Sequence, residues 1–136
     1  MPTKWPSLED ALKEIQNNGF PEEPVAISNE LIAELNEDQL NILGKLDELT
    51  TKGAELEKQI AARRPNASGV FNDGYAVTIC EDEDDFIIIT AGLRHELDGV
   101  VKETRKVLGD AIMNGLSHLG IIQRVSIQYG LISAEQ

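Results

Sequence analysis

The sequence has few of the features that mark a secreted, membrane-spanning or nucleic-acid-binding protein. Cysteine occurs once, at Cys80, so no intramolecular disulfide can form, which favours a reducing, cytoplasmic compartment. No apolar run approaches the length of a membrane span, and no signal peptide is expected, because a polar amphipathic segment follows the first residues directly. Lysine and arginine number 12, too few to predict a basic stripe for nucleic acid or an anionic membrane.

Acidic residues number 24 and give the chain a formal net charge of -12. Such an excess keeps a protein soluble and favours basic partners over phosphate-bearing ones. Two interpretations stay open, because the charge provides either solubility alone or attraction for a basic partner protein. The 136 residues predict a single domain, 1–136, and only 4% are aromatic, so aliphatic side chains must build the core.

Residues 1–27 predict a short amphipathic helix followed by a loop. Ser7 resembles an N-cap, and apolar side chains recur at helical spacing over residues 8–18. Gly19 is a stop signal, and prolines make the loop over residues 19–27 semi-rigid. The helix is expected either to cap the core or to dock as an arm on a neighbouring subunit.

A long helical segment is predicted over residues 28–64, because Pro65 forces an end there. Asn36, with Gln39 three residues later, resembles an internal cap, so the segment is either continuous or broken near Asn36. A continuous helix from residue 37 to residue 64 would be about 40 Å long.

Apolar residues of this segment recur at the heptad spacing of a coiled coil, with a polar interruption at Gln39 and a gap at Gly53. This heptad seam consists of Ile32, Leu35, Ile42, Leu46, Leu49, Leu56 and Ile60. A helix this long exceeds what a compact three-stranded sheet covers, so the seam is expected to form an interface between copies in a homo-oligomer. The alternative is that the helix packs only on other helices of its own chain.

Residues 69–133 predict a ββαβ unit. Alternating residues over 75–80 and the β-branched run over 86–90 predict two strands. A helical apolar face follows over 93–119, and Gly120 is expected to end that helix. Alternation over 121–131 predicts a third strand.

The predicted fold class is therefore α+β, in the order α-α-β-β-α-β. A long helix with a coiled-coil-like seam joins a three-stranded, mostly antiparallel sheet that a second long helix covers. Three glycines lower the helix propensity of residues 93–119, and close approach of a neighbouring element is expected to compensate. They are Gly99, Gly109 and Gly115.

Neither a catalytic constellation nor a metal-ligand spacing is present in the sequence. His95 and His118 are separated by most of a predicted helix, and no Cys/His cluster accompanies them. Ser117 adjoins His118, yet adjacent helical positions do not face each other, which argues against a nucleophile–base pair. We therefore expect a non-enzymatic protein without cofactor or metal; an active site assembled from distant residues is the remaining alternative.

The most conspicuous local feature is a run of five acidic residues between the first two predicted strands. It consists of Glu81, Asp82, Glu83, Asp84 and Asp85. The run predicts a solvated hairpin loop. A docking loop for a basic partner ranks next, and divalent-ion binding ranks last, because the position of the EF-hand glycine holds Ile87.

The only basic doublet, Arg63–Arg64, stands at the end of the long helical segment, where cations suit the helix dipole. If the helices assemble, Arg63, Arg64 and Arg94 would converge on a small anionic ligand. The expected function is thus an acidic interaction module that self-associates and binds a partner protein, as an adaptor, chaperone, inhibitor or assembly component. The alternative is a binding protein for a nucleotide-like anion, with its site at a subunit interface.

Overall fold

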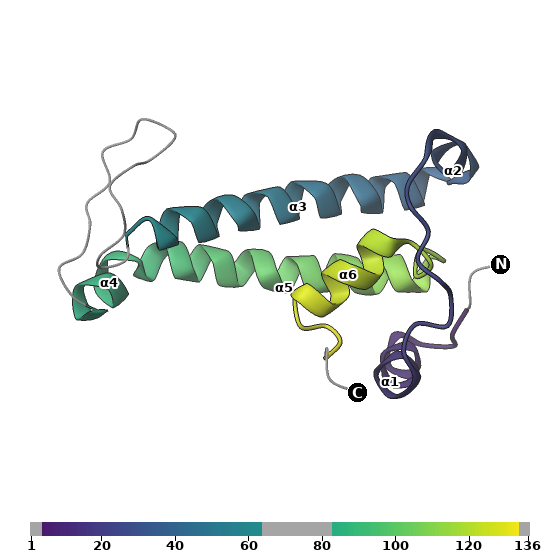
Figure 1. Cartoon of the computed structure of the whole chain (residues 1–136), viewed down its shortest axis with the longest axis horizontal. Coiled ribbons are helices and arrows are strands. Elements are labelled where there is room, and N and C mark those ends of the chain that lie inside the picture. The colour runs from purple at the N-terminus through teal and green to yellow at the C-terminus, as the bar shows by residue number, and fades with distance from the viewer. Residues whose placement is uncertain (1–3, 64–82, 134–136) are drawn as a thin grey trace. The chain divides into compact units, whose positions relative to one another are not determined.

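The computed structural model describes residues 4–63 and 83–133, and over these residues the chain is mostly helical (Figure 1). The helices are α1 (Leu8–Asn18), α2 (Asn29–Glu34), α3 (Glu37–Ala61), α4 (Glu83–Ile89), α5 (Ala91–Met113) and α6 (Gly120–Gln128). The described residues form no sheet, and their one β feature is an isolated parallel bridge between Val25 and Leu119. The predicted α+β fold with a three-stranded sheet is therefore wrong.

The predicted last strand, residues 121–131, is largely the helix α6. Its sequence fits both periodicities, because apolar residues alternate while the buried ones also recur at helical spacing. The buried positions are Ile122, Val125, Ser126 and Tyr129. These positions follow i, i+3, i+4 and i+7, so they all lie on one face of a helix. The predicted strand is therefore wrong.

The predicted central strand, residues 86–90, is also wrong, because these residues belong to α4 and the turn that follows it. The helix begins at Glu83, so Asp84 and Asp85 lie in its first turn, where carboxylates stabilise the helix dipole. The prediction of a hairpin loop over the acidic run is therefore wrong for residues 83–85, which are helical. Glu81, Asp82 and the predicted strand over residues 75–80 lie outside the described residues.

The first helix, α1, has the predicted bounds. Ser7 is its N-cap, and the Ser7 Oγ accepts a hydrogen bond from the Asp10 backbone N–H at 3.2 Å. Gly19 ends the helix with φ of 79°, and its N–H donates to the Ile15 carbonyl at 2.8 Å. A left-handed residue in this place is typical of glycine. The helix buries Ala11 and Ile15.

The long helical segment breaks where the sequence offered an internal cap. The Asn36 Oδ1 accepts from the Gln39 N–H at 2.8 Å, and the Gln39 Oε1 accepts from the Asn36 N–H at 3.0 Å. This reciprocal pair is a capping box that starts α3, after Leu35 has left the helical conformation of α2 with ψ of 144°.

The helix predicted over residues 93–119 is α5, which begins earlier and ends at Met113. Its stop is Gly115, in the left-handed region at φ of 78°, and not Gly120, which instead starts α6. The Leu116 N–H donates to the Ala111 carbonyl at 3.0 Å and closes the turn. Glycine permits this backbone because other residues pay a steric cost there.

The described residues group into two compact units. Unit 1 comprises residues 4–48 and 103–133, and unit 2 comprises the described part of Leu49–Lys102. In unit 1, α1 packs closely on α5, since a Cβ on Gly109 would lie 2.7 Å from the Leu8 Cδ2. The close approach predicted for this glycine is confirmed, whereas Gly99 has no neighbour within 4 Å of such a Cβ.

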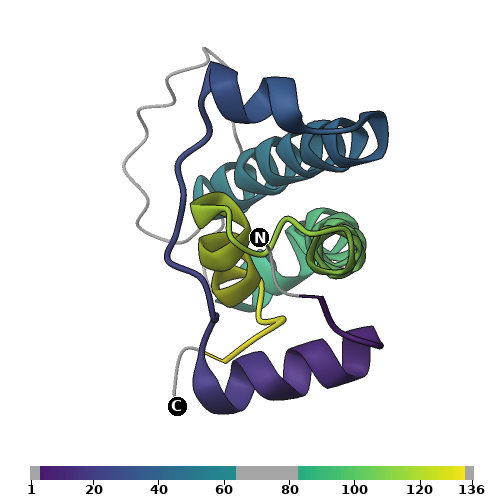
Figure 2. The ribbon, with the colours of Figure 1, turned by 90° about the vertical axis from the view of Figure 1, so that its right-hand side faces the viewer.

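Polar contacts join distant segments of unit 1. The chain between α1 and α2 passes beside the start of α6 (Figure 2), where the Val25 N–H donates to the His118 carbonyl and the Gly120 N–H to the Val25 carbonyl. The Gln39 Nε2 donates to the carbonyl of Asn114 at 2.7 Å. The core of unit 1 contains Trp5, Ala11, Ile15, Leu46, Val107, Leu108, Ala111, Ile112, Leu116, Leu119, Ile122, Val125, Tyr129 and Ile132.

Unit 2 has a smaller core. Ile60 of α3 and Phe86 of α4 form a buried cluster against which Leu93 and Leu97 of α5 pack. Thr90, fully buried, donates from its Oγ1 to the Phe86 carbonyl and so satisfies an acceptor of the last turn of α4.

Candidate functional site

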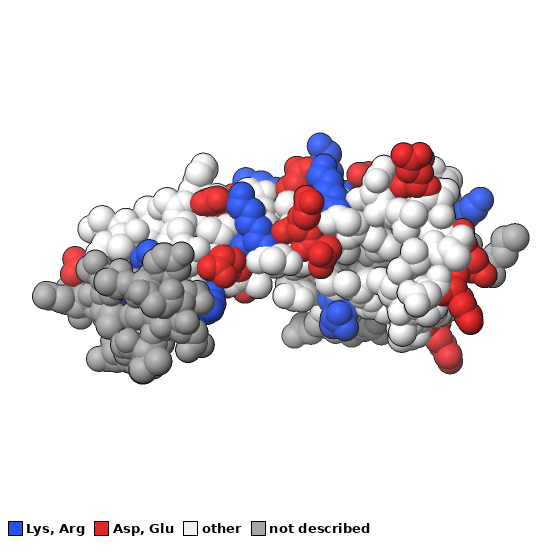
Figure 3. All heavy atoms as spheres, turned by 90° about the horizontal axis from the view of Figure 1, so that it is seen from above, with Lys and Arg blue, Asp and Glu red and all other residues white. Residues whose placement is uncertain are grey.

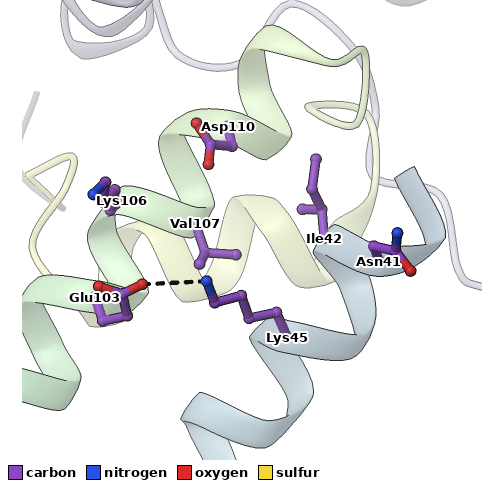
Figure 4. Close-up of a pocket in the computed structure, with 7 residues that line it drawn as sticks. All are labelled: Asn41, Ile42, Lys45, Glu103, Lys106, Val107 and Asp110. Carbon is purple, nitrogen blue, oxygen red and sulfur yellow. Dashed lines mark ion pairs between the residues drawn. The ribbon is translucent and has the colours of Figure 1, made fainter. Parts of the chain in front are cut away.

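The first candidate is a groove of about 200 Å³ within unit 1, between the N-terminal half of α3 and the C-terminal half of α5 (Figure 4). Asn41, Ile42 and Lys45 line it from α3, and Glu103, Lys106, Val107 and Asp110 line it from α5. Figure 4 shows Lys45 extending to Glu103, with 3.3 Å between the Lys45 Nζ and the Glu103 Oε1.

The charges of this groove balance, because two lysines face two carboxylates. Both partners of the Lys45–Glu103 pair are about half exposed, at 58% and 44%. Such a surface pair contributes roughly 0–1 kcal/mol, so it neither fixes the groove nor selects an ion. The lining contains no serine, threonine, cysteine or histidine, so it offers no nucleophile–base pair of the kind used in acyl transfer.

Charges of both signs also lie close together elsewhere. In unit 2, the Lys52 Nζ lies 3.3 Å from the Glu96 Oε1, and the Lys102 Nζ lies 2.9 Å from the Asp98 Oδ2. On the face drawn in Figure 3, acidic and basic side chains are interspersed in the middle. No one charge sign marks that area as a binding surface.

The heptad seam takes three environments. Leu46, Leu56 and Ile60 are buried by the chain itself, Leu35, Ile42 and Leu49 are half-buried, and Ile32 is exposed. Burial at Leu46 belongs to unit 1, whereas burial at Leu56 and Ile60 belongs to unit 2. At these three positions the seam is already covered, so they need no second copy of the chain to bury them.

The predicted anion-binding arginines engage backbone carbonyls near helix ends. The Arg63 Nη1 donates to the Gln59 carbonyl at 2.7 Å, at the end of α3. Arg94 donates to the Ile87 carbonyl and to the Thr90 Oγ1, at the end of α4. Arg63 thus lies at the end of the long helix, where the simpler prediction placed it, and both arginines satisfy carbonyls near the end of a helix. Arg64 lies outside the described residues.

The titratable candidates do not gather into a site. His95 is exposed on α5, and the buried His118 Nδ1 has no hydrogen-bond partner in the described part of the chain. Within residues 4–63 and 83–133, no three His, Cys, Asp or Glu side chains are placed to hold a metal ion. Of the acidic run, Asp84 is exposed and Asp85 is half-buried, both on α4.

The second candidate is an apolar surface on α4 that we call the isoleucine surface. It consists of Ile87, Ile88 and Ile89, whose exposed fractions are 52%, 73% and 44%. The residues on either side of the triplet are buried: Phe86 precedes it and Thr90 follows it. Helical spacing puts these two positions on one face, so the three isoleucines turn outward to solvent.

The third candidate is a groove of about 390 Å³ that we call the linker groove, within unit 1. The extended residues Pro24, Val25, Ala26 and Ile27 line it, together with Gly120, Ile121 and Arg124 at the start of α6. Val25 and Ile27 are 42% and 44% exposed. Apolar side chains thus form most of a concave surface with one cation at its edge.

Neither the isoleucine surface nor the linker groove was predicted from the sequence. The isoleucines were assigned to a buried strand, and residues 24–27 to a plain loop. One signal was available for α4: acidic residues directly before an apolar run also fit the first turn of a helix, which would have exposed part of that run. For the linker groove, no local signal distinguishes an extended loop that pairs with a distant turn.

None of the helices in the described ranges combines the length and the hydropathy needed to cross a bilayer. Comparison of the chain with protein-family models, with curated proteins and with solved structures found no match. A function must therefore be argued from the residues described above.

Proposed function

We propose that this protein is a non-enzymatic interaction module that self-associates through the isoleucine surface of α4. The observation that carries the proposal is the exposure of Ile87, Ile88 and Ile89, three large apolar side chains in succession. Contiguous exposed apolar side chains are typical of interaction sites. The proposal places the protein in a reducing, cytoplasmic compartment, which the single cysteine favours.

A second copy is the occupant we favour, because the charges at the two ends of α4 are self-complementary. Asp84 lies in the first turn, and Arg94 binds the Ile87 carbonyl near the last turn. When a twofold axis lies perpendicular to α4, the two copies of the helix run antiparallel, so Asp84 of each copy would approach Arg94 of the other. Burial of the isoleucines supplies the free energy, and the charges set the orientation.

The test is the molar mass of the full chain over a range of concentrations, measured by sedimentation equilibrium. We expect a reversible increase in mass that Ile88→Glu abolishes, because the substitution places a charge in the middle of the apolar contact. Ile88 is the most exposed of the three, so the variant should fold as the parent does, which circular dichroism checks.

Ile32→Glu is the matched control, since Ile32 is an exposed isoleucine of the heptad seam on α2. It should leave the association unchanged. Loss of association with Ile32→Glu but not with Ile88→Glu would assign the interface to the seam instead. A strictly monomeric parent at every concentration would contradict self-association altogether.

A small-anion site at a subunit interface ranks second. Its arginines within the described part, Arg63 and Arg94, engage carbonyls near helix ends, and no observation places them around a common cavity.

A further inference from the structure

The linker groove has an open backbone edge in addition to its apolar lining. The Val25 N–H and C=O both pair with the chain at the start of α6, through His118 and Gly120. In an extended chain, the polar groups of the next residue point to the opposite side. The Ala26 N–H and C=O make no hydrogen bond to any described residue, so they are available to a further strand.

The side chains beside this edge are apolar and half exposed. Val25 and Ile27, two residues apart, belong to one face of the extended segment, and Ile121 adds an apolar side chain from α6. An added strand would therefore gain backbone hydrogen bonds from Ala26 and apolar contacts from Val25 and Ile27, which is the mode called β-augmentation.

The stretch of sequence that contains the linker is acidic. No lysine or arginine occurs between Lys13 and Lys45, and Arg124 is the one cation that lines the groove. The same part of the sequence carries the exposed carboxylates Glu23, Glu30, Glu34, Glu37 and Asp38. Like charges repel and opposite charges attract over several ångströms in dilute salt, so a basic strand is favoured here over an acidic one.

We infer that the linker groove binds an extended segment of a partner protein in which apolar residues alternate with lysine or arginine. The segment pairs with the Ala26 backbone, packs apolar side chains against Val25 and Ile27, and places its cations near the carboxylates of the linker sequence, of which Glu23 directly precedes the lining residue Pro24. The inference rests on the proposed function only in treating the chain as an interaction module, because it concerns another surface and another partner.

The direct test uses a fluorescein-labelled octapeptide of alternating valine and lysine, titrated with the full chain and followed by fluorescence anisotropy. Saturable binding is expected, at least about tenfold tighter than that of the valine–glutamate peptide or of the serine–lysine peptide. A third peptide carries an N-methyl group on every residue and should bind more weakly, because neither of its edges can donate the hydrogen bonds of a paired strand. This arm changes the ligand alone and leaves the protein intact.

Variants locate the site. Ile27→Ser should weaken binding roughly tenfold, since it removes a half-exposed apolar side chain from the groove. Ala26→Pro should also weaken binding, because it removes the N–H that the added strand would use. The double charge reversal Glu23→Lys/Glu34→Lys should weaken the lysine peptide, whereas the control Glu48→Lys/Glu57→Lys, with the same change of net charge elsewhere, should have a smaller effect.

Equal affinity for the lysine and glutamate peptides would overturn the inference, as would absence of binding at about 1 mM protein, a concentration at which even weak complexes form. Unchanged affinity of the folded Ile27→Ser and Ala26→Pro variants would also overturn it. None of these outcomes affects the molar mass of the chain alone, so failure here and failure of self-association through α4 can be told apart.

Discussion

Gly99 and Gly109 are both interior residues of α5, yet their surroundings differ. A Cβ on Gly99 would meet nothing within 4 Å, whereas a Cβ on Gly109 would lie 2.7 Å from the Leu8 Cδ2. The first glycine carries a cost in backbone entropy without a packing benefit. The second permits α1 to approach α5 within unit 1.

We predict that Gly99→Ala raises the free energy of unfolding by about 0.5–1 kcal/mol, the usual gain in an open helix position. Gly109→Ala should lose most of this gain, because the new methyl group displaces the end of the Leu8 side chain. Urea unfolding followed by circular dichroism measures both. Equal stabilisation by the two substitutions would show that α1 does not pack on Gly109 as described.

The single tryptophan provides a local check. Trp5 is buried, and its indole Nε1 donates to the Glu14 carboxylate on α1. The methyl group of Gly109→Ala pushes on α1 through the Leu8 side chain and should therefore change the emission of Trp5, while Gly99→Ala should not. A tryptophan hydrogen-bonded to a charged partner reports such movements because its partner and its exposure change together.

Among the elements, α3 depends on the capping box at its start. We predict that Asn36→Ala lowers the free energy of unfolding by about 1 kcal/mol, since the Gln39 N–H loses its side-chain acceptor. Asn41→Ala is the control, because Asn41 is exposed within the same helix and alanine has the higher propensity there. An equal decrease in the free energy of unfolding in both variants would show that the Asn36 cap does not stabilise α3.

The sequence predicted several helix ends correctly from capping and stop signals. Ser7 with Gly19 bounded α1, and Asn36 with Gln39 located the break before α3, because these side chains act on backbone groups only a few residues away. The signals at Gly115 and Gly120 were misassigned, since a glycine serves equally at the end of one helix and at the start of the next.

Strands and helices could not be told apart where an apolar sequence satisfied both periods. Val125, Ile127, Tyr129 and Leu131 alternate, but the buried set of α6 follows helical spacing, and tertiary packing decides between them. The candidate surfaces could not be predicted from the sequence for a related reason. Exposure at Ile88, or the pairing of Val25 with Leu119, depends on segments that the local sequence does not specify.

At the scale of the whole molecule, the net charge of -12 makes opposite salt dependences the expected result for the two proposed contacts. Two copies repel each other, and this repulsion is screened beyond about 10 Å at 0.1 M salt. We predict that added sodium chloride strengthens self-association through the isoleucine surface. It should weaken binding of the valine–lysine peptide to the linker groove.

Sedimentation equilibrium and anisotropy titrations at low and high salt make this comparison. Sodium sulfate is not a substitute for sodium chloride in this experiment. Sulfate is excluded from the protein surface and strengthens apolar contacts directly, in addition to screening charge. Self-association that weakened as sodium chloride rose would show that ion pairs, and not the isoleucines, hold the copies together.

Unit 1 is built from two stretches of chain with residues 49–102 between them. On the ribosome, the apolar side chains of Ile15 and Leu46 are made first, and much of the core that shelters them, from Val107 to Ile132, is made last. At about 5–20 residues per second, translation of the intervening residues takes roughly 3–11 s. For that interval the nascent chain displays unsheltered aliphatic residues, so its early exposure to chaperones is a direct result of this chain order.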